Sequence, residues 1–423
     1  MWKERKFRMK KLLTVLLALF MVFSLVGCSG GKEETPADQP AEGYNGPKIG
    51  VILVGDENEG YTYAHILGIR EAAAKLGIPD EAIIWKYSVP EDQTCYDMAV
   101  DLVENGATLV ISNSYGHQSF MQQAASEYPE VTFVADTGDT AAVSGLSNLK
   151  NAFPHTFESR YVSGVVAGMK IKELSDNGVL VPENYTSDGN VKVGYVGAFP
   201  YAEVVSGYTA FFLGIKSVFP EVEMFVEFTN SWFDLTAEGT VADDLMSQGC
   251  VIVGQHADST GAPTKLQENM EGNKYGFTAY SVGYNVSMLD VAPDVALTSA
   301  SNVWEKFYSY AFTCWQNGDE MMTDWSEGYE TGAVEITDLG KAVAQGTQEA
   351  VDAAIAAIKS GELHVFDAST FTIGGEVPTS MLGDVDADFT PEKECLIDGY
   401  FHESEFRSAP YFAEKIDGIT TLN

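Results

Sequence analysis

The chain has 423 residues, which exceeds the usual size of one domain, so we expect two compact lobes. It carries 61 Asp and Glu against 25 Lys and Arg, a net charge of −36 at pH 7. A surface this acidic repels nucleic acid and anionic lipid, which argues against DNA, RNA or a membrane surface as a partner.

The first 27 residues are typical of a secretory signal peptide. Six Lys and Arg between positions 3 and 11 precede an apolar run over 12–26, which is too short to span a bilayer comfortably. The run ends in Leu25-Val26-Gly27-Cys28, and small residues before a cysteine resemble the lipobox of bacterial lipoproteins. We therefore predict cleavage after residue 27, lipidation of Cys28, and anchoring outside the cytoplasm to the bacterial cell membrane by lipid alone. An ordinary signal peptide with a chance cysteine is the alternative.

Residues 28–46 contain almost no large apolar side chains, so they cannot bury enough surface to offset the entropy of ordering. We expect a flexible tether that holds the body, residues 47–423, away from the membrane. The body has four cysteines without Cys-x-x-Cys spacing, which excludes a zinc or redox motif of that kind. Their disulfide status stays open; they are Cys95, Cys250, Cys314 and Cys395.

The body begins with short β-branched runs that alternate with helical patterns. The run 48–54 predicts a strand buried on both faces, and the apolar spacing over 64–76 predicts a helix that ends at Gly77. Further strands are predicted at 82–85, 108–112 and 132–135, with helices at 92–104 and 118–127. This alternation is the pattern of a parallel sheet.

The pattern restarts with a long helix over 158–174, in which Gly164 and Gly168 suggest close packing against another helix. Strands are predicted at 192–196, 223–228, 251–254, 275–279 and 295–299, and helices at 204–218, 235–247, 261–271, 303–317 and 345–360. Beyond Thr370 the chain is irregular. The predicted fold class is α/β, with two doubly wound parallel-sheet lobes joined by a hinge. Residues 47–154 plus about 302–360 form the first lobe, and residues 155–301 plus about 361–423 form the second lobe and the C-terminal tail.

Ligands of such sheets bind beyond the carboxyl ends of the strands. There this chain places aromatic rings, amides and carboxylates, a mixture suited to a flat, hydrogen-bonding small molecule between two lobes. The predicted ligand-binding residues are Asn58, Tyr61, Tyr63, Asn113, Tyr115, Phe199, Trp232, Asp258, Asn285 and Trp304.

Tyr61 and Asp258 illustrate the reasoning and its alternatives. An aromatic face on a heterocyclic base contributes about 1–3 kcal/mol, which favours stacking by Tyr61; the alternative is a ring that caps the first helix. The Asp258 carboxylate can accept two hydrogen bonds at once, from an amino group and a ring N–H or from paired ribose hydroxyls. Its alternative role is the N-cap of the helix over 261–271.

Two motifs that suggest other chemistry fail on inspection. His256, Asp258 and Ser259 are neighbours on one loop, so they cannot converge as a catalytic triad does, and no Gly-x-Ser-x-Gly elbow is present. The run Asp384-x-Asp386-x-Asp388 begins like a calcium loop but has Phe in place of the sixth-position Gly and Cys in place of the twelfth-position Glu. We predict no enzymatic activity, no metal site and no cofactor.

The chain is similar to the basic membrane protein family, the purine nucleoside receptor-like substrate-binding lipoproteins of ABC importers. Besides the lipobox, the resemblance is carried by residues 49–54, 60–65, 160–169, 194–200, 203–204, 229–234 and 255–259. Segments 229–234 and 255–259 are most similar to the branch associated with purine bases. The chain departs from that branch in having Tyr61 where tryptophan is usual, and Asp56 or Asn58 where the family has an early aspartate. The tail beyond Thr370 matches least.

The resemblance implies a type I periplasmic-binding-protein-like fold, ABC permease subunits as partners and a purine base or nucleoside as ligand. Hinge closure over the ligand needs no covalent chemistry. A ligand-sensing surface lipoprotein, or a binding protein for a flavin or sugar, remains the alternative. A repressor would need a basic DNA-binding head in place of the lipobox, and a surface enzyme would need a convergent catalytic set.

Overall fold

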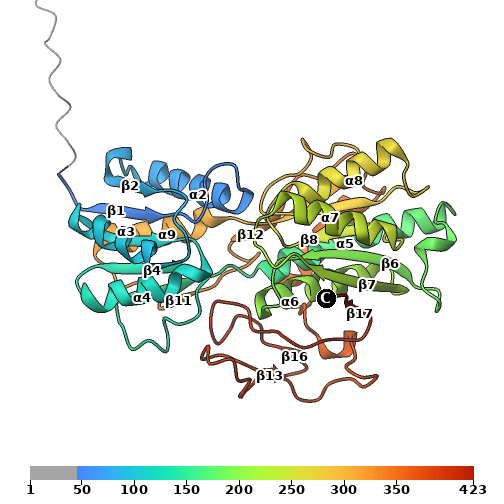
Figure 1. Cartoon of the computed structure of the whole chain (residues 1–423). Helices are drawn as coiled ribbons and strands as arrows, with labels where there is room; N and C mark the ends of the chain where they lie inside the picture. The colour runs from blue at the N-terminus through green and yellow to red at the C-terminus, as the bar shows by residue number, and fades with distance from the viewer. Residues whose placement is uncertain (1–44) are drawn as a thin grey trace, which may run out of the picture. The chain divides into compact units, whose positions relative to one another are not determined.

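The computed structural model describes residues 45–423, and its first lobe is built on a parallel six-stranded sheet (Figure 1). The strand order is β11-β5-β4-β3-β1-β2. The strands are β1 Lys48–Ile52, β2 Ile83–Lys86, β3 Ala107–Ser112, β4 Thr132–Asp136, β5 Leu149–Ala152 and β11 Asp324–Trp325. The helices are α2 Gly60–Leu76, α3 Gln93–Glu104, α4 Gln118–Glu127 and α9 Trp304–Asn317, of which α2 packs on α9 and α3 on α4.

The second lobe is built on a seven-stranded sheet in the order β12-β10-β9-β8-β6-β7-β17, parallel except for β12. Its strands are β6 Val191–Gly197, β7 Val222–Phe228, β8 Ile252–Gln255, β9 Tyr280–Tyr284, β10 Ala296–Asn302, β12 Val334–Ile336 and β17 Ile419–Thr421. Its helices are α5 Thr156–Asp176, α6 Ala202–Val218, α7 Leu235–Ser247, α8 Gly261–Gly272 and α10 Thr347–Ser360. The two lobes confirm the predicted α/β fold with parallel-sheet lobes.

The glycines of α5 allow it to cross α6 at very short range. A Cβ atom on Gly164 would lie 2.1 Å from the Phe211 carbonyl oxygen, and one on Gly214 would lie 2.0 Å from the Tyr161 carbonyl oxygen. Both distances are far inside van der Waals contact, so any side chain would force the helices apart. The close packing inferred from Gly164 and Gly168 is confirmed.

One predicted strand was placed too early in the sequence. Residues 275–279 precede β9, whose strand Tyr280–Tyr284 pairs with β8 and β10. Gly276 has a φ of 76°, a left-handed conformation that interrupts extended structure, and the Asn269 side chain donates a hydrogen bond to the Phe277 carbonyl oxygen at 3.3 Å. The local β propensity of 275–279 is thus overridden by its turn.

The predicted division of the chain between lobes is wrong for residues 334–360. Only α9 and β11 of the range 302–360 belong to the first lobe, whereas β12 pairs with β10 and α10 packs on α5 of the second lobe. The apolar face of α10, including the buried Val351, joins the second lobe's core. Sequence order could not reveal this, because the chain returns across the hinge after β11.

Three connections join the lobes: β5 to α5, β10 to α9, and β11 to β12. Hydrogen bonds link these connections to one another. The Phe153 N–H donates to the Trp325 carbonyl at 3.0 Å, the Val303 N–H donates to the Ala333 carbonyl at 2.8 Å, and the Thr156 hydroxyl donates to the Asn302 side chain at 2.8 Å. These short crossings form the hinge.

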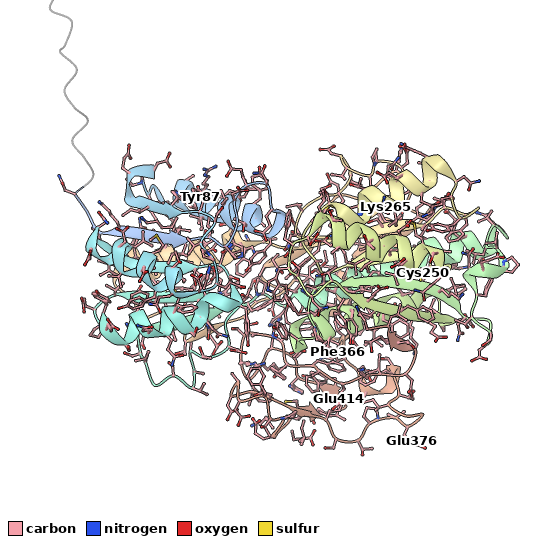
Figure 2. The ribbon with its side chains drawn as sticks, in the orientation of Figure 1. Tyr87, Cys250, Lys265, Phe366, Glu376 and Glu414 are labelled. Carbon is pink, nitrogen blue, oxygen red and sulfur yellow. The ribbon has the colours of Figure 1, made fainter. Side chains whose placement is uncertain are left out.

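Residues 361–423, which we call the C-terminal segment, pack against the second lobe. They contain the short strands β13 Leu382–Gly383, β14 Lys393–Glu394, β15 Leu396–Ile397 and β16 Tyr400–Phe401, besides β17. Phe366, labelled in Figure 2, stacks on Phe412 at 4.4 Å, and the buried Glu403 accepts hydrogen bonds from the Ser206 hydroxyl and the Phe412 N–H. The segment also reaches the first lobe, where the Ser408 hydroxyl donates to Asp324 at 2.6 Å.

The predicted signal peptide, the Cys28 lipidation site and nearly all of the tether lie outside the described residues. Among residues 45–423, no helix is long and apolar enough to cross a bilayer. Cys95, Cys250, Cys314 and Cys395 are all buried free thiols.

Candidate functional site

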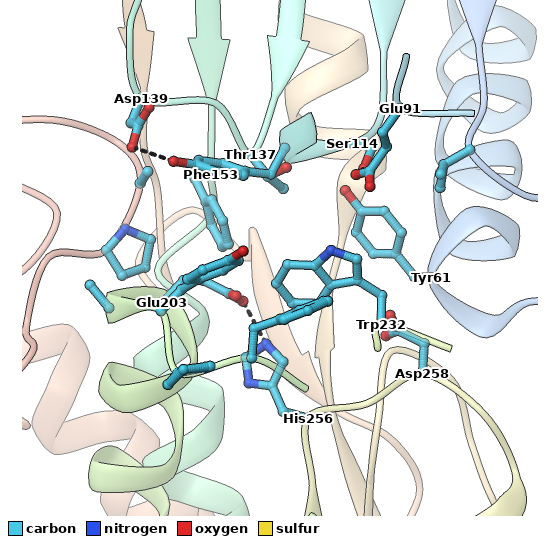
Figure 3. Close-up of a pocket in the computed structure, with 18 of the residues that line it drawn as sticks. Tyr61, Glu91, Ser114, Thr137, Asp139, Phe153, Glu203, Trp232, His256 and Asp258 are labelled. Carbon is cyan, nitrogen blue, oxygen red and sulfur yellow. Dashed lines mark hydrogen bonds and ion pairs between the residues drawn. The ribbon is translucent and has the colours of Figure 1, made fainter. Parts of the chain in front are cut away.

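A cavity of about 800 Å³ lies where the strand ends of both lobes and the C-terminal segment meet (Figure 3). Its volume is within the range of about 300–1,000 Å³ typical of small-molecule sites. Because parallel strands deliver their following loops to one edge of each sheet, the cavity occupies the position expected for this architecture.

The second lobe lines the cavity with three rings packed on one another. Phe199 and Tyr201 follow β6, and their rings stack at 5.2 Å with an interplanar angle of 12°. Trp232 follows β7 and meets the Phe199 ring edge-on at 5.0 Å. Mutual packing fixes the orientation of these rings, so they form a preformed surface for a planar ligand.

The first lobe contributes two tyrosines and several polar side chains. Tyr61 begins α2; its hydroxyl donates to the Asn113 carbonyl oxygen, and its ring contacts His65 edge-on at 4.5 Å. Tyr115 follows β3, and its hydroxyl donates to Asp139 at 3.3 Å. Burial, followed by the negative charge of Asp139, raises the pKa of Tyr115 to about 12, so this hydroxyl keeps its proton.

Asp258 lines the cavity from the loop after β8 and is almost fully buried. Asn285 donates to Asp258 Oδ1 at 2.6 Å, while Thr260 and not Asp258 occupies the N-cap of α8. Burial, reinforced by the nearby Glu59, raises the pKa of Asp258 well above its usual range. A carboxyl that holds its proton offers a donor and an acceptor together, which matches one edge of a heterocyclic base.

The loop that carries Asp258 is supported from behind by Glu238 of α7. The Ser259 N–H donates to both oxygens of the Glu238 carboxyl at 3.1 Å, and the Asp234 N–H donates to one of them at 3.1 Å. Burial raises the pKa of Glu238 to about 7. Glu238 itself is outside the cavity lining and acts on the site only through this loop.

An imidazole and a guanidinium lie at the base of the second lobe's wall. His256 Nε2 is 2.7 Å from Glu203 Oε1, and burial lowers the pKa of His256 despite that carboxylate. Arg160 of α5 donates to the Gln255 carbonyl at 2.6 Å and lies 3.6 Å above the Tyr284 ring. Arg160 thereby places one buried positive charge beneath a cavity wall rich in carboxylates.

The structure brings six of the ten predicted ligand-binding residues to the cavity wall. These are Asn58, Tyr61, Tyr115, Phe199, Trp232 and Asp258. Asn58 is exposed, and its side chain donates to Asp56 at 2.8 Å.

The other four, Tyr63, Asn113, Asn285 and Trp304, do not line it, and their expected positions were wrong. Tyr63 is two residues beyond Tyr61 on α2, about 200° around the helix, and is 39 % exposed. Trp304 is 1 % exposed and stacks on His65 at 4.0 Å inside the first lobe.

Asn113 and Asn285 position residues that do line the cavity. Asn113 accepts a hydrogen bond from the Val54 N–H at 2.8 Å, and its carbonyl oxygen receives the Tyr61 hydroxyl. Asn285 holds Asp258, as described above. Their polar side chains at strand ends gave the right region of the fold but not the direction in which each points.

Several lining residues are not among the ten predicted ligand-binding residues. They are Glu59, Glu91, Asp139, Tyr201, Glu203, His256 and Tyr284, together with residues of the C-terminal segment. Tyr201 and His256 lie in loops that follow predicted strands, and Tyr284 is the last residue of β9, so position at a strand end was a usable signal. The C-terminal residues carried no such signal, because no regular strand precedes them.

The acidic run in the C-terminal segment brings four carboxyl groups together. Single ligand atoms of Asp384, Asp386, Asp388 and Glu392 lie within 4.8 Å of one another. The left-handed backbone of Ala387 and Phe389 folds the loop back on itself. Because exposed acidic groups often cluster in this way without binding an ion, the cluster alone does not define a metal site.

The model of a family described as "ABC transporter substrate-binding protein PnrA-like" (Bmp) matches residues 47–368. A purine-binding protein of Brucella abortus (strain 2308) is 28 % identical over 320 residues, covering 75 % of this chain and 83 % of that protein. A putative ABC transporter glucose-binding protein of Haloferax volcanii is 27 % identical over 349 residues, covering 81 % and 80 %.

Solved structures share the fold at lower identity. An ABC transporter solute-binding protein from Aeropyrum pernix K1 is similar with a TM-score of 0.61 and 15 % identity, covering 79 % of this chain and 94 % of that one. One from Conexibacter woesei has a TM-score of 0.58 and 20 % identity, covering 75 % and 98 %. The C-terminal segment beyond residue 368 has no counterpart in the family match.

Proposed function

Because this chain belongs to the PnrA-like family of ABC transporter substrate-binding proteins, we propose that its cleft captures a purine base or nucleoside for import. Members of such families bind small solutes outside the cytoplasm, work with ABC permeases and catalyse no reaction. The purine-binding relative from Brucella abortus supports the choice of ligand.

The observation that carries the proposal is the pairing of a ring surface with a protonatable acid. Phe199, Tyr201 and Trp232 provide the π faces, and every purine has a face to stack on them. Asp258 lies on the same lobe and offers an in-plane donor and acceptor to the edge of the base. Tyr61 and Tyr115 approach from the first lobe, so a bound base would be enclosed from both sides.

Closure follows from this division of contacts. A ligand held on the second lobe gains further contacts only when the first lobe approaches, so it favours the closed arrangement of the two lobes. The three hinge connections permit such a rotation while the sheets stay intact. The closed shape is what an ABC permease would distinguish from the empty protein.

We also infer a lipid anchor at Cys28, from the basic and apolar segment that precedes it. Expression of the full-length protein and its Cys28→Ala variant, followed by membrane fractionation, tests this inference. The wild type should sediment with membranes and the variant should not. Equal release of both proteins would remove the anchor from the proposal.

Isothermal titration calorimetry of the full-length protein tests the ligand. Adenine, guanine, hypoxanthine and their ribonucleosides should be titrated beside riboflavin, ribose and glucose, after unfolding and refolding to remove any carried ligand. Saturable binding of a purine supports the proposal. Binding of a sugar or flavin alone would keep the import role but replace the ligand.

A further inference from the structure

The C-terminal segment completes one end of the cavity. Ten of the residues that line the cavity come from this segment, among them Asp384, Arg407 and Tyr411. All lie beyond residue 368, where the match to the family ends. This part of the wall therefore lies outside the region that the family model matches.

Arg407 is the central residue of this end and is held rigidly. It is 6 % exposed, its Nε donates to the Ala409 carbonyl at 3.2 Å, and its Nη2 donates to the Pro410 carbonyl at 3.4 Å. The guanidinium also lies 5.9 Å from the Tyr411 ring centroid. Two carbonyls and a ring thus fix the direction of the remaining nitrogen, Nη1.

Nη1 faces two carboxyl groups without forming a hydrogen bond to either. It is 3.5 Å from Asp139 of the first lobe and 3.9 Å from Asp384 of the C-terminal segment. Within residues 45–423, Arg407 Nη1, Asp139 Oδ1 and Asp384 Oδ1 are buried atoms without a hydrogen-bond partner. Asp139, like Arg407, is more than nine-tenths buried, at 7 % exposed.

Leaving a buried polar atom unpaired costs about 1–3 kcal/mol, so three such atoms on one cavity wall point to a missing partner. The partner must donate to carboxylate oxygens and accept from a guanidinium nitrogen. Hydroxyl groups do both, and neighbouring hydroxyls can serve several of these atoms at once. Two carboxylates against one guanidinium leave the wall net negative, which disfavours an anionic group such as a phosphate.

The end of the cavity that contains Arg407 adjoins the surface formed by the rings of Phe199, Tyr201 and Trp232, but it is separate from Asp258. Tyr115 donates to Asp139 and its ring lies 6.1 Å from that of Tyr201, which belongs to the ring surface. Figure 3 shows Asp139 and Asp258 at opposite sides of the cavity, with Trp232 between them. A ligand whose base stacks on the rings could therefore extend a substituent toward Arg407.

We propose that Arg407, Asp139 and Asp384 form a subsite for an uncharged, hydroxyl-bearing substituent of the ligand, a sugar in the chemical sense. Resting on the proposed purine function, this makes the preferred ligand a nucleoside over a free base or a nucleotide. Since Asp139 belongs to the first lobe while Arg407 is rooted on the second, hydroxyls bound here also join the two lobes.

Calorimetry of the full-length protein with matched ligands tests the subsite. Adenosine, 2′,3′-dideoxyadenosine, adenine and adenosine monophosphate share one base and differ in hydroxyls and charge. Wild type should bind adenosine at least tenfold more tightly than the other three. In Arg407→Gln that preference should fall to about threefold or less while the affinity for adenine changes little. Lys415→Gln, which removes an exposed positive charge of the same segment outside the cavity, should behave as wild type.

Asp384→Asn is the second variant, because replacing Arg407 could disturb the packing around it. Asp384 is partly exposed, so its substitution should disturb the packing little. It should nevertheless produce the same loss of preference for adenosine. A wild type that binds adenosine and the dideoxy analogue equally, or an Arg407→Gln preference equal to that of wild type, overturns the subsite while leaving purine binding intact. If no purine ligand binds the wild type, including the ligands based on guanine and hypoxanthine, titration with ribose and glucose tests the subsite by itself. Sugar binding that Arg407→Gln abolishes supports the subsite and refutes the purine proposal, and no binding of any hydroxylated compound overturns both.

Discussion

The two walls of the cleft are organised differently. The second lobe presents rings that pack on one another and an acid held by Asn285 and by the Glu238-supported loop. The first lobe presents tyrosines and separate carboxyl, hydroxyl and amide groups, and some of these side chains, such as Asn58, are exposed. The second wall is therefore formed before the ligand arrives, whereas the first gains its contacts on closure. We expect most of the binding free energy to reside in the second lobe.

Removal of Trp232 should give the largest effect. Trp232→Ala deletes a stacking face worth about 1–3 kcal/mol, so the dissociation constant of the bound purine should rise about 5- to 150-fold. Calorimetry measures it, with Tyr87→Ala as the control because Tyr87 is an exposed aromatic residue of the first lobe outside the cavity (Figure 2). Equal affinities of the two variants would contradict the role of the ring surface.

Asp258→Ala should come next. The variant loses one or two hydrogen bonds to the base edge, each worth about 1 kcal/mol, so affinity should fall about 5- to 30-fold. Asp258→Asn keeps the shape and one donor and acceptor, and should retain more affinity than the alanine variant. If both variants bind as tightly as wild type, the acid serves only to hold Asn285.

The support of the Asp258 loop should depend on pH. The folded pKa of Glu238, about 7, lies above its unfolded value of about 4.3, so the stability it contributes is complete below that value and is lost as pH rises through 7. Urea unfolding of wild type and Glu238→Gln between pH 4.5 and 7.5 should show the wild-type advantage shrinking by about 3 kcal/mol, because each unit between the folded and unfolded pKa corresponds to about 1.4 kcal/mol. A difference that is constant with pH would contradict this assignment.

The first lobe should yield the smallest change. Tyr61→Phe keeps the ring and removes only the hydroxyl that donates to the Asn113 carbonyl oxygen. Ligand affinity should therefore change less than about threefold, while the free energy of unfolding drops by about 1 kcal/mol. A tenfold loss of affinity would show that the Tyr61 hydroxyl contacts the ligand. The first lobe would then contribute more to the binding free energy than the comparison of the two lobes predicts.

The site could be predicted in outline from strand ends. Tyr61, Trp232 and Asp258 reach the cavity because parallel strands deliver their following residues to one edge. Tyr63 failed because helical rotation turns it away, and Asn113 failed because a backbone N–H of the neighbouring segment captures its side chain. The direction in which a side chain points depends on contacts with residues that are distant in the sequence.

The sequence by itself determined the two α/β lobes and the edge where the ligand binds, because hydrophobic periodicity and strand-to-helix alternation are properties of neighbouring residues. Only the tertiary structure decided that β12 and α10 return to the second lobe and that the C-terminal segment walls one end of the cleft. The ion pair between Arg407 and Asp139 joins two residues that are 268 positions apart in the sequence. No local pattern encodes that contact, since it arises from packing the whole chain.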